Sequence, residues 1–246
     1  MWSEWVTQPA NLELSSGAVH VWRAWLKQPH SVAGRLAGTL SQDEQLRAGR
    51  FRFAQDRMSF VVARGILRNI LAGYLQTDPG SIRFAYSPNG KPALSTAIEK
   101  IPLRFNISHS HGLAIYAVTR SCEVGIDAEY IRPLDDLNAI IEVIFSPAER
   151  KLLHDLPAAE QLRAFFTGWV RKEAYVKAIG EGLARSIDQI DVLFFTEHPA
   201  TVWQPLVGPQ PLLGRTLIDL FPIPDYSAAL VIDGDGLELS QWHWAE

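Results

Sequence analysis

The feature that most constrains the fold is a helical pattern that begins near Ser41 and ends near Leu75. Apolar and aromatic residues recur at helix spacing in its second part, at Phe60, Leu67, Ile70, Leu71, Tyr74 and Leu75. A helix with one apolar face must bury that face against another layer of structure. A turn-rich loop, YSPNGKPAL, comes next, and three strand-like runs follow it at 103–108, 113–119 and 123–131. This order predicts helices packed beside a sheet.

The second half of the sequence begins afresh with helical signals. The run Ser146-Pro147-Ala148-Glu149 has the form of a capping box with proline at the first helical position. Residues 158–179 predict a longer helix that ends at Gly180 and Gly182. Other strand-like runs lie at 19–26, 188–195, 214–221, 227–233 and 236–243. Together the patterns predict an α+β fold in two halves, divided near Arg120–Glu123, although the sequence shows no clear internal repeat.

Composition narrows the classes of function. A chain of 246 residues suffices for one large domain or two small ones. The net charge of −4 argues against a broad nucleic-acid-binding surface, and no apolar run approaches the ~18 residues of a membrane span. The single cysteine, Cys122, excludes an intrachain disulfide framework, and the N-terminus lacks the order of a signal peptide, so we expect a cytoplasmic protein. A local pocket for a phosphorylated ligand is predicted by clustered arginines: Arg47, Arg50, Arg52, Arg57, Arg64 and Arg68.

Two carboxylates in the run GIDAE form the first candidate site. On a strand, side chains two residues apart share a face, so Asp127 and Glu129 are predicted to point the same way. Neighbouring carboxylates repel each other unless a cation or a proton lies between them. Such an oxygen-rich pair suits magnesium, which binds a few carboxylates and fills its other positions with water or phosphate. An ordinary solvent-facing strand edge explains the same residues equally well.

The run WVRKEAYVK provides the second candidate. Trp169, Glu173 and Lys177 follow one another at intervals of four, so they lie along one side of the predicted helix. Glu173 could supply a third carboxylate to a metal or accept a proton from an attacking hydroxyl. Lys177 could neutralise charge that grows on phosphate oxygens. The competing interpretation is a helix-stabilising Glu–Lys pair, worth only about 0.2–0.5 kcal/mol.

The run FNISHSHG, which ends at Gly112, provides a third candidate. Small polar residues at a strand end, followed by glycine, leave backbone amides accessible to an anion, and His109 could contact a phosphate. A zinc site at His109 and His111 lacks a third ligand at a recognisable spacing. Upstream, Lys91 stands in a Gly-Lys-Pro turn, where it is by itself an unremarkable exposed lysine. None of these signals decides the function alone.

Taken in this order, the runs FNISHS, GIDAE and WVRKEAYVKAIGEGL resemble the signature of the Sfp-type 4′-phosphopantetheinyl transferases. The Gly-Lys-Pro turn and the arginine-rich helix that ends in ARGILRNIL match as well, so the likeness extends from about Ser41 to Asp191. It implies a pseudo-dimer of two similar α+β halves, 1–121 and 122–246, with coenzyme A in the cleft between them. The WVRKEA form is similar to the subgroup linked to fatty-acid and polyketide carriers. The run VHVWRAWL resembles cyanobacterial members.

The resemblance also implies a role for each matching position. Three carboxylates would bind magnesium: Asp127, Glu129 and Glu173. Six residues would contact coenzyme A, with His109 at the 3′-phosphate, Lys177 at the pyrophosphate and Lys91 in the nucleotide pocket; the others are Ser108, Arg47 and, as a weaker candidate, Arg64. The FSxxE position is filled by Glu149, whose capping-box role already explains it, so no chemistry is assigned to it.

The implied reaction moves the phosphopantetheine arm of coenzyme A to a serine of an apo carrier protein, and 3′,5′-ADP leaves. Glu173, directly or through a metal-bound water, is the predicted general base, and Lys177 would stabilise the leaving phosphate. The implied partners are acyl or peptidyl carriers of fatty-acid, polyketide or nonribosomal peptide synthesis. A monomer is expected because the two halves already form the cleft.

Two other functions stay open from the residues. One is a metal-dependent hydrolase that cleaves the pyrophosphate of nucleotide cofactors, which would release phosphopantetheine to water. The other is an inactive relative that binds carrier proteins without modifying them. The set Asp127, Glu129 and Glu173 argues against the latter, because a binding module need not keep a metal site.

Overall fold

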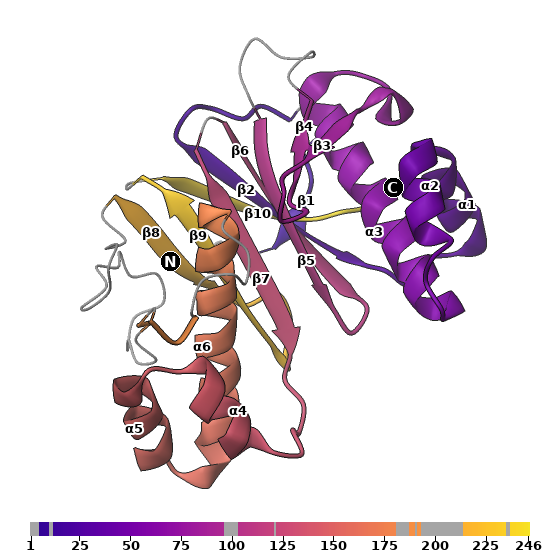
Figure 1. The fold of residues 1–246 in the computed structure, drawn as a ribbon. Coiled ribbons are helices and arrows are strands. Elements are labelled where there is room, and N and C mark those ends of the chain that lie inside the picture. The colour runs from indigo at the N-terminus through magenta and orange to yellow at the C-terminus, as the bar shows by residue number, and fades with distance from the viewer. Residues whose placement is uncertain are drawn as a thin grey trace.

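The computed structural model describes residues 5–9, 12–95, 103–120, 122–180, 187–189, 191–192, 214–234 and 237–246 (Figure 1). The helices are α1 (His30–Gly38), α2 (Gln42–Ala48), α3 (Ala54–Leu75), α4 (Leu137–Ile144), α5 (Pro147–Asp155) and α6 (Ala158–Ile179), with short 3-10 turns at Pro79–Ser81 and Ile187–Gln189. The strands are β1 (Val6–Thr7), β2 (Ala18–Trp25), β3 (Phe84–Tyr86), β4 (Pro92–Leu94), β5 (Leu103–Ser110), β6 (Leu113–Arg120), β7 (Val124–Tyr130), β8 (Arg215–Leu220), β9 (Tyr226–Asp233) and β10 (Glu238–His243). The α+β fold predicted from the sequence is confirmed.

The first half of the chain builds a sheet covered by α3. Its strand order is β1-β10-β2-β6-β5; β6 is antiparallel to both β2 and β5, whereas β10 is parallel to β2. Apolar residues of α3, among them Ile66 and Leu67, pack against sheet residues that include Trp22 and Tyr116. This buried cluster is the core of the first half, and Figure 1 shows α3 along one face of the sheet.

The helical pattern over 41–75 is divided in the structure. Helix α2 ends at Ala48 and α3 begins at Ala54, because the chain turns at Gly49, whose N–H bonds back to the last turn of α2. Helix α3 is also the one described helix whose length and composition would allow it to cross a membrane. Two thirds of its most apolar window is buried within the fold, as expected for a core helix.

The second half builds an antiparallel sheet, β7-β9-β8, which is covered by α6. The predicted helix 158–179 is confirmed, and it ends at Gly180 with a φ of 74°, a conformation that favours glycine. Gly125 of β7 lies directly beneath this helix. A Cβ atom at Gly125 would collide with the backbone of Ala174 and Ala178, so glycine is required for the close approach of β7 to α6.

The two halves meet where β7 runs beside β5. Asn106 Oδ1 on β5 accepts a hydrogen bond from the backbone N–H of Ile126 on β7 (2.9 Å), and the serines of β5 bond to side chains of β7. The last strand, β10, returns to the first sheet, so sheet membership crosses the division at 121/122. That division stays a prediction.

Most other elements match their predicted positions. The capping box at Ser146 and Glu149 is confirmed, as are strands near 19–26, 103–108, 113–119, 214–221, 227–233 and 236–243. Helices α1 and α4 and strands β1, β3 and β4 were not predicted. The run 86–94 was expected to be a loop, but its last residues form β4, which pairs with β3 in a hairpin. Gly182 and half of the predicted strand 188–195 lie outside the described residues. The described part is not a strand, because Ile187–Gln189 forms a 3-10 turn and 191–192 have no regular structure.

Candidate active site

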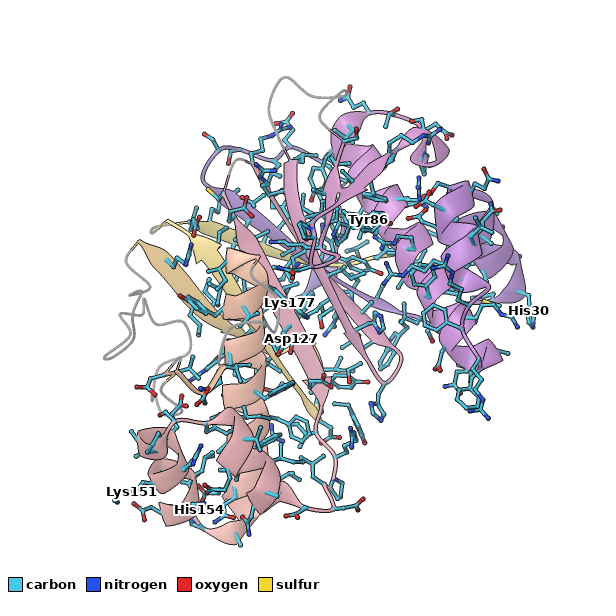
Figure 2. All side chains as sticks on the ribbon, viewed as in Figure 1. His30, Tyr86, Asp127, Lys151, His154 and Lys177 are labelled. Atoms are coloured by element: carbon cyan, nitrogen blue, oxygen red, sulfur yellow. The ribbon has the colours of Figure 1, made fainter. Side chains whose placement is uncertain are left out.

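The candidate site lies at the junction of the halves, where β7 passes between β5 and α6. Asp127 is buried on β7, with 3% of its surface exposed. Its Oδ1 atom accepts hydrogen bonds from the Nζ of Lys177 (2.6 Å) and the Oγ of Ser108 (2.7 Å). The Lys177 ammonium also donates to Ser108 Oγ (3.1 Å). Strands β5 and β7 and helix α6 therefore converge on one carboxylate, and Figure 2 shows Asp127 and Lys177 together at this point.

Glu129 stands two residues further along β7 and is held by the same neighbouring strand. Its Oε2 accepts a hydrogen bond from the Oγ of Ser110 (2.6 Å). The same hydroxyl accepts a hydrogen bond from the backbone N–H of Tyr130 (3.2 Å). The opposite face of β7, with Ile126 and Ala128, is buried in an apolar cluster. The alternation predicted from GIDAE is thus present in the fold.

Burial and mutual repulsion act on the carboxylates. Desolvation, followed by the nearby charge of Asp127, raises the pKa of Glu173 above its usual range. Desolvation is also the largest cause of the raised pKa of Glu129, with Asp127 adding to it and the Ser110 hydrogen bond opposing it. Each raised pKa means that the ionised form lacks compensating positive charge. Lys177 offsets part of the repulsion felt by both glutamates.

The donor set fits a hard divalent cation. Two carboxylate oxygens, Asp127 Oδ2 and Glu173 Oε1, are buried without a hydrogen-bond partner, and such atoms are costly unless a charge satisfies them. Among the described residues, no three or more His, Cys, Asp or Glu side chains are arranged so that they could together hold a metal ion. An ion here would therefore draw further ligands from water or phosphate, as oxygen-bound magnesium typically does. The metal role of Asp127, Glu129 and Glu173 stays a prediction.

His109 lies near this site on β5, with its side chain exposed. Desolvation by the surrounding protein, followed by the positive charges of Lys177 and Arg64, lowers its pKa, while Asp127 opposes the shift. His109 is therefore mostly neutral at pH 7 unless an anion binds beside it. His111 instead occupies the turn after β5 and stacks on Tyr130, with ring centroids 4.8 Å apart. The predicted contact of His109 with a phosphate stays a prediction.

A cavity of about 640 Å³ lies between α2 and the β3–β4 hairpin. Its lining includes Arg47, Arg50 and Phe51 from the end of α2 and the loop after it, and Tyr86 and Gly90 from the hairpin. Arg47 is exposed there, with its guanidinium 5.5 Å from the centre of the Phe60 ring. Two exposed arginines beside aromatic rings suit an anionic ligand with a flat base.

Arg64, the weaker candidate from the sequence, forms a buried ion pair instead of facing the cavity. Arg64 is buried on α3 and pairs with Glu44 at 3.2 Å, and Arg68 pairs with the same carboxylate at 2.7 Å. Desolvation is the main cause that lowers the pKa of Arg64. Glu44 is fully buried, so this cluster fixes α2 against α3. Arg64 thus has a structural role, whereas Arg47 is exposed at the cavity; a phosphate contact by either arginine stays a prediction.

Lys91 is directed toward α6 by the hairpin that carries it. Its ammonium donates to the backbone carbonyls of Lys177 (2.6 Å) and Val124 (3.3 Å) and lies 3.6 Å from a carboxylate oxygen of Glu123. Its neighbour Gly90, rather than Lys91 itself, contributes to the cavity described above. Lining of the nucleotide pocket by Lys91 stays a prediction.

Sequence reasoning missed three functional contacts. Ser110 and Asn106 orient β7, and their place on the same face of β5 as Ser108 was available from the alternation in FNISHS. Glu149 does more than cap α5, because it forms a buried ion pair with Lys172 at 2.7 Å. No local pattern indicates this pair, since its partners lie on different helices.

Comparison with known proteins identifies the family of this chain. A family model described as the 4′-phosphopantetheinyl transferase superfamily matches residues 123–214, and one described as the N-terminal part of a 4′-phosphopantetheinyl transferase matches residues 23–121. The chain is 40% identical over 240 residues to the 4′-phosphopantetheinyl transferase HetI of Nostoc sp., a match that covers 98% of each chain. The chain belongs to the 4′-phosphopantetheinyl transferase family.

Other relatives are more distant. A putative 4′-phosphopantetheinyl transferase of Synechocystis sp., slr0495, is 30% identical over 151 residues, 61% of each chain. The 4′-phosphopantetheinyl transferase Sfp of Bacillus subtilis is 26% identical over 171 residues, 70% of this chain and 74% of that one. A solved holo-[acyl-carrier-protein] synthase of Thermotoga maritima has a TM-score of 0.34 and 22% identity over 48% of this chain and 64% of that chain. The resemblance drawn from the motifs, including its cyanobacterial character, is confirmed.

Proposed function

We propose that this protein transfers the 4′-phosphopantetheine arm of coenzyme A to a serine of apo carrier proteins, with magnesium as its metal. The observation that carries the proposal is the meeting of Asp127, Glu173 and Lys177 at the junction of the halves, in a chain of this family. The physiological setting we propose is a cytoplasmic monomer that serves carriers of fatty-acid, polyketide or nonribosomal peptide synthesis.

The reaction is a phosphoryl-type transfer. The carrier serine oxygen attacks the phosphorus that bears the pantetheine arm, and the bond from that phosphorus to the bridging pyrophosphate oxygen breaks. The serine proton passes to Glu173, and 3′,5′-ADP leaves with the bonding electrons. The buried Oε1 atom of Glu173 has no hydrogen-bond partner within the protein, so the carboxylate is free to accept that proton.

The other residues align the substrate and neutralise charge. Lys177 would face the leaving phosphate while Ser108 and Asp127 hold its ammonium in place. The carboxylate oxygens of Asp127, Glu129 and Glu173 would hold magnesium, which when bound would neutralise charge on the pyrophosphate. Arg47 would bind the nucleotide phosphates from the neighbouring cavity, and His109 would bind the 3′-phosphate. Most of the expected rate enhancement is thus alignment and electrostatic stabilisation.

The intact mass of an apo acyl carrier protein, measured after incubation with this protein, coenzyme A and magnesium, tests the proposal. We expect the carrier to gain the mass of one phosphopantetheine, and the gain to disappear when the metal is chelated. A carrier whose attacking serine is replaced by alanine provides the matched control. Free phosphopantetheine released without any modified carrier would instead identify a pyrophosphate hydrolase.

A further inference from the structure

The C-terminal end of α6 is bound by side chains from the other half of the molecule. The last carbonyls of a helix have no partners within it and must find them elsewhere. The Lys177 carbonyl accepts a hydrogen bond from the Lys91 ammonium (2.6 Å), and the Gly180 carbonyl accepts one from the side-chain amide of Asn89 (3.1 Å). Both donors come from the loop between β3 and β4, about 90 residues earlier in the chain. This loop therefore caps the helix that carries Glu173.

The charge of Lys91 suits that position. The C-terminal end of a helix carries partial negative charge, so a cation there stabilises the helix by about 0.3–1 kcal/mol, and by more where the pair is partly buried. The ammonium is half-buried, donates to two backbone carbonyls and forms an ion pair with Glu123. Arg104 shares Glu123 at 3.2 Å, which keeps that carboxylate beside Lys91.

The loop itself is well defined. The backbone N–H of Ser87 donates to the carbonyl of Lys91 (2.9 Å), and the N–H of Lys91 donates to the hydroxyl of Ser87 (3.0 Å). Gly90, between them, has a φ of 79°, which favours glycine. The turn presents Gly90 to the arginine-lined cavity and the side chains of Asn89 and Lys91 to α6. One short loop therefore contacts both the cavity and the helix.

We propose that Lys91 and Asn89 are positioning residues, which clamp the last turn of α6 so that Lys177 and Glu173 face the substrate. Lys177 is held at both ends, because its carbonyl bonds to Lys91 while its ammonium bonds to Asp127. This clamp rests on the function proposed above, for which it supplies the coupling between the two halves.

A direct contact between Lys91 and the phosphates of coenzyme A is the competing explanation, and kinetics together with binding separate the two. We expect Lys91→Met, which keeps most of the side-chain length, to lower kcat about tenfold while the Kd for coenzyme A, measured by calorimetry, changes less than about threefold. Asn89→Ala, which loses one neutral hydrogen bond, should act in the same direction with a smaller effect. A tenfold loss of coenzyme A affinity at unchanged kcat would overturn the clamp.

Amide hydrogen exchange gives a readout that does not depend on transfer activity. In Lys91→Met and Asn89→Ala, amides of the last turn of α6, 176–180, should exchange faster, while those at its start, 158–170, keep the wild-type rate. Lys151→Met is the matched control, because Lys151 is exposed on α5 and pairs only with Asp155, far from the site in Figure 2. Unchanged exchange at 176–180 in both variants would overturn the clamp even if kcat is lowered. Failure of the wild-type protein to modify any carrier would count against the proposed function alone, since exchange is measured without a carrier.

Discussion

The two long helices are built on the same plan, yet only one carries the candidate chemistry. Helices α3 and α6 each have 22 residues and end in a left-handed residue, Gln76 and Gly180 respectively. A short helix with a capping box, Ser-x-x-Glu, precedes each of them, and in both cases its glutamate is buried. This shared plan is the physical basis of a duplicated fold whose sequence shows no clear repeat.

The buried glutamates anchor equivalent positions. Glu44 pairs with Arg68 and Glu149 pairs with Lys172, and both cations stand at the same position counted from the start of their helix. The residue that follows the anchoring cation differs between the two helices. On α3 it is Asn69, whose side-chain amide donates to a carbonyl of the same helix. On α6 it is Glu173, which is partly desolvated. Equivalent ion pairs therefore precede an asparagine with a structural role in one half and a candidate catalytic carboxylate in the other.

Substitutions of Glu173 and Asn69 should show the largest difference between the two helices. We expect Glu173→Ala to lower the rate of transfer by about 10²–10⁴, because both a general base and a metal ligand are lost. Asn69→Ala is the matched control and should keep the wild-type rate within about twofold. Asp127→Ala should resemble Glu173→Ala, and circular dichroism would verify that each variant folds. Near-normal carrier modification by Glu173→Ala at ordinary magnesium concentration would refute the site assignment.

The anchors themselves should be equally important to stability in both halves. We expect Glu149→Gln to lower the free energy of unfolding by about 3–5 kcal/mol, because it removes the negative charge from a buried ion pair with Lys172. Glu44→Gln should cost at least as much, since two arginines share that carboxylate. The exposed pair Lys151–Asp155 provides the control, and Asp155→Asn should cost less than about 1 kcal/mol. Urea unfolding measures all three, and equal costs at buried and exposed pairs would contradict the anchoring role.

The comparison also explains what the sequence could predict. The helix 158–179 and its end at Gly180 were predictable because apolar spacing and a left-handed glycine are local signals. The shared face of Asp127 and Glu129 was predictable for the same reason, since strand alternation spans only two residues. The contacts of Lys91 and the Glu149–Lys172 pair were not, because they join elements distant in the chain or on separate helices. Local patterns indicated the site residues, whereas the fold determines which of them touch.

A third prediction sharpens the electrostatic difference between the helices. The folded protein holds protons on Glu173 and Glu129 more tightly than the unfolded chain does, because their pKa values are raised. In the absence of metal, stability should therefore fall as the pH rises from about 4.5 through these raised pKa values. Magnesium binds the ionised form, so the rise in Tm that it causes should be larger at pH 7 than at pH 5.

The size of this effect follows from mass action. A free magnesium concentration of 100 times its Kd stabilises the folded state by about 2.7 kcal/mol. Glu173→Gln should remove most of that stabilisation, while Asp155→Asn should keep it, because Asp155 lies on α5 in an exposed ion pair. A Tm that responds to magnesium equally in both variants would place the metal elsewhere.

The smallest expected effect concerns His109, which lies on β5 in the first half of the chain. Its pKa is lowered by desolvation and by the cations Lys177 and Arg64, so it is mostly neutral until an anion approaches. A bound 3′-phosphate would favour the protonated ring, and the resulting contact should be worth about tenfold in affinity, or about 1.4 kcal/mol. We expect His109→Ala to weaken coenzyme A by this factor and dephospho-coenzyme A by less than about twofold, measured by calorimetry at pH 7. His111→Ala, in the adjoining turn, is the control. An equal loss for both ligands would show that His109 does not recognise the 3′-phosphate. In the first half, phosphate binding would then be assigned to the cavity lined by Arg47 and Arg50.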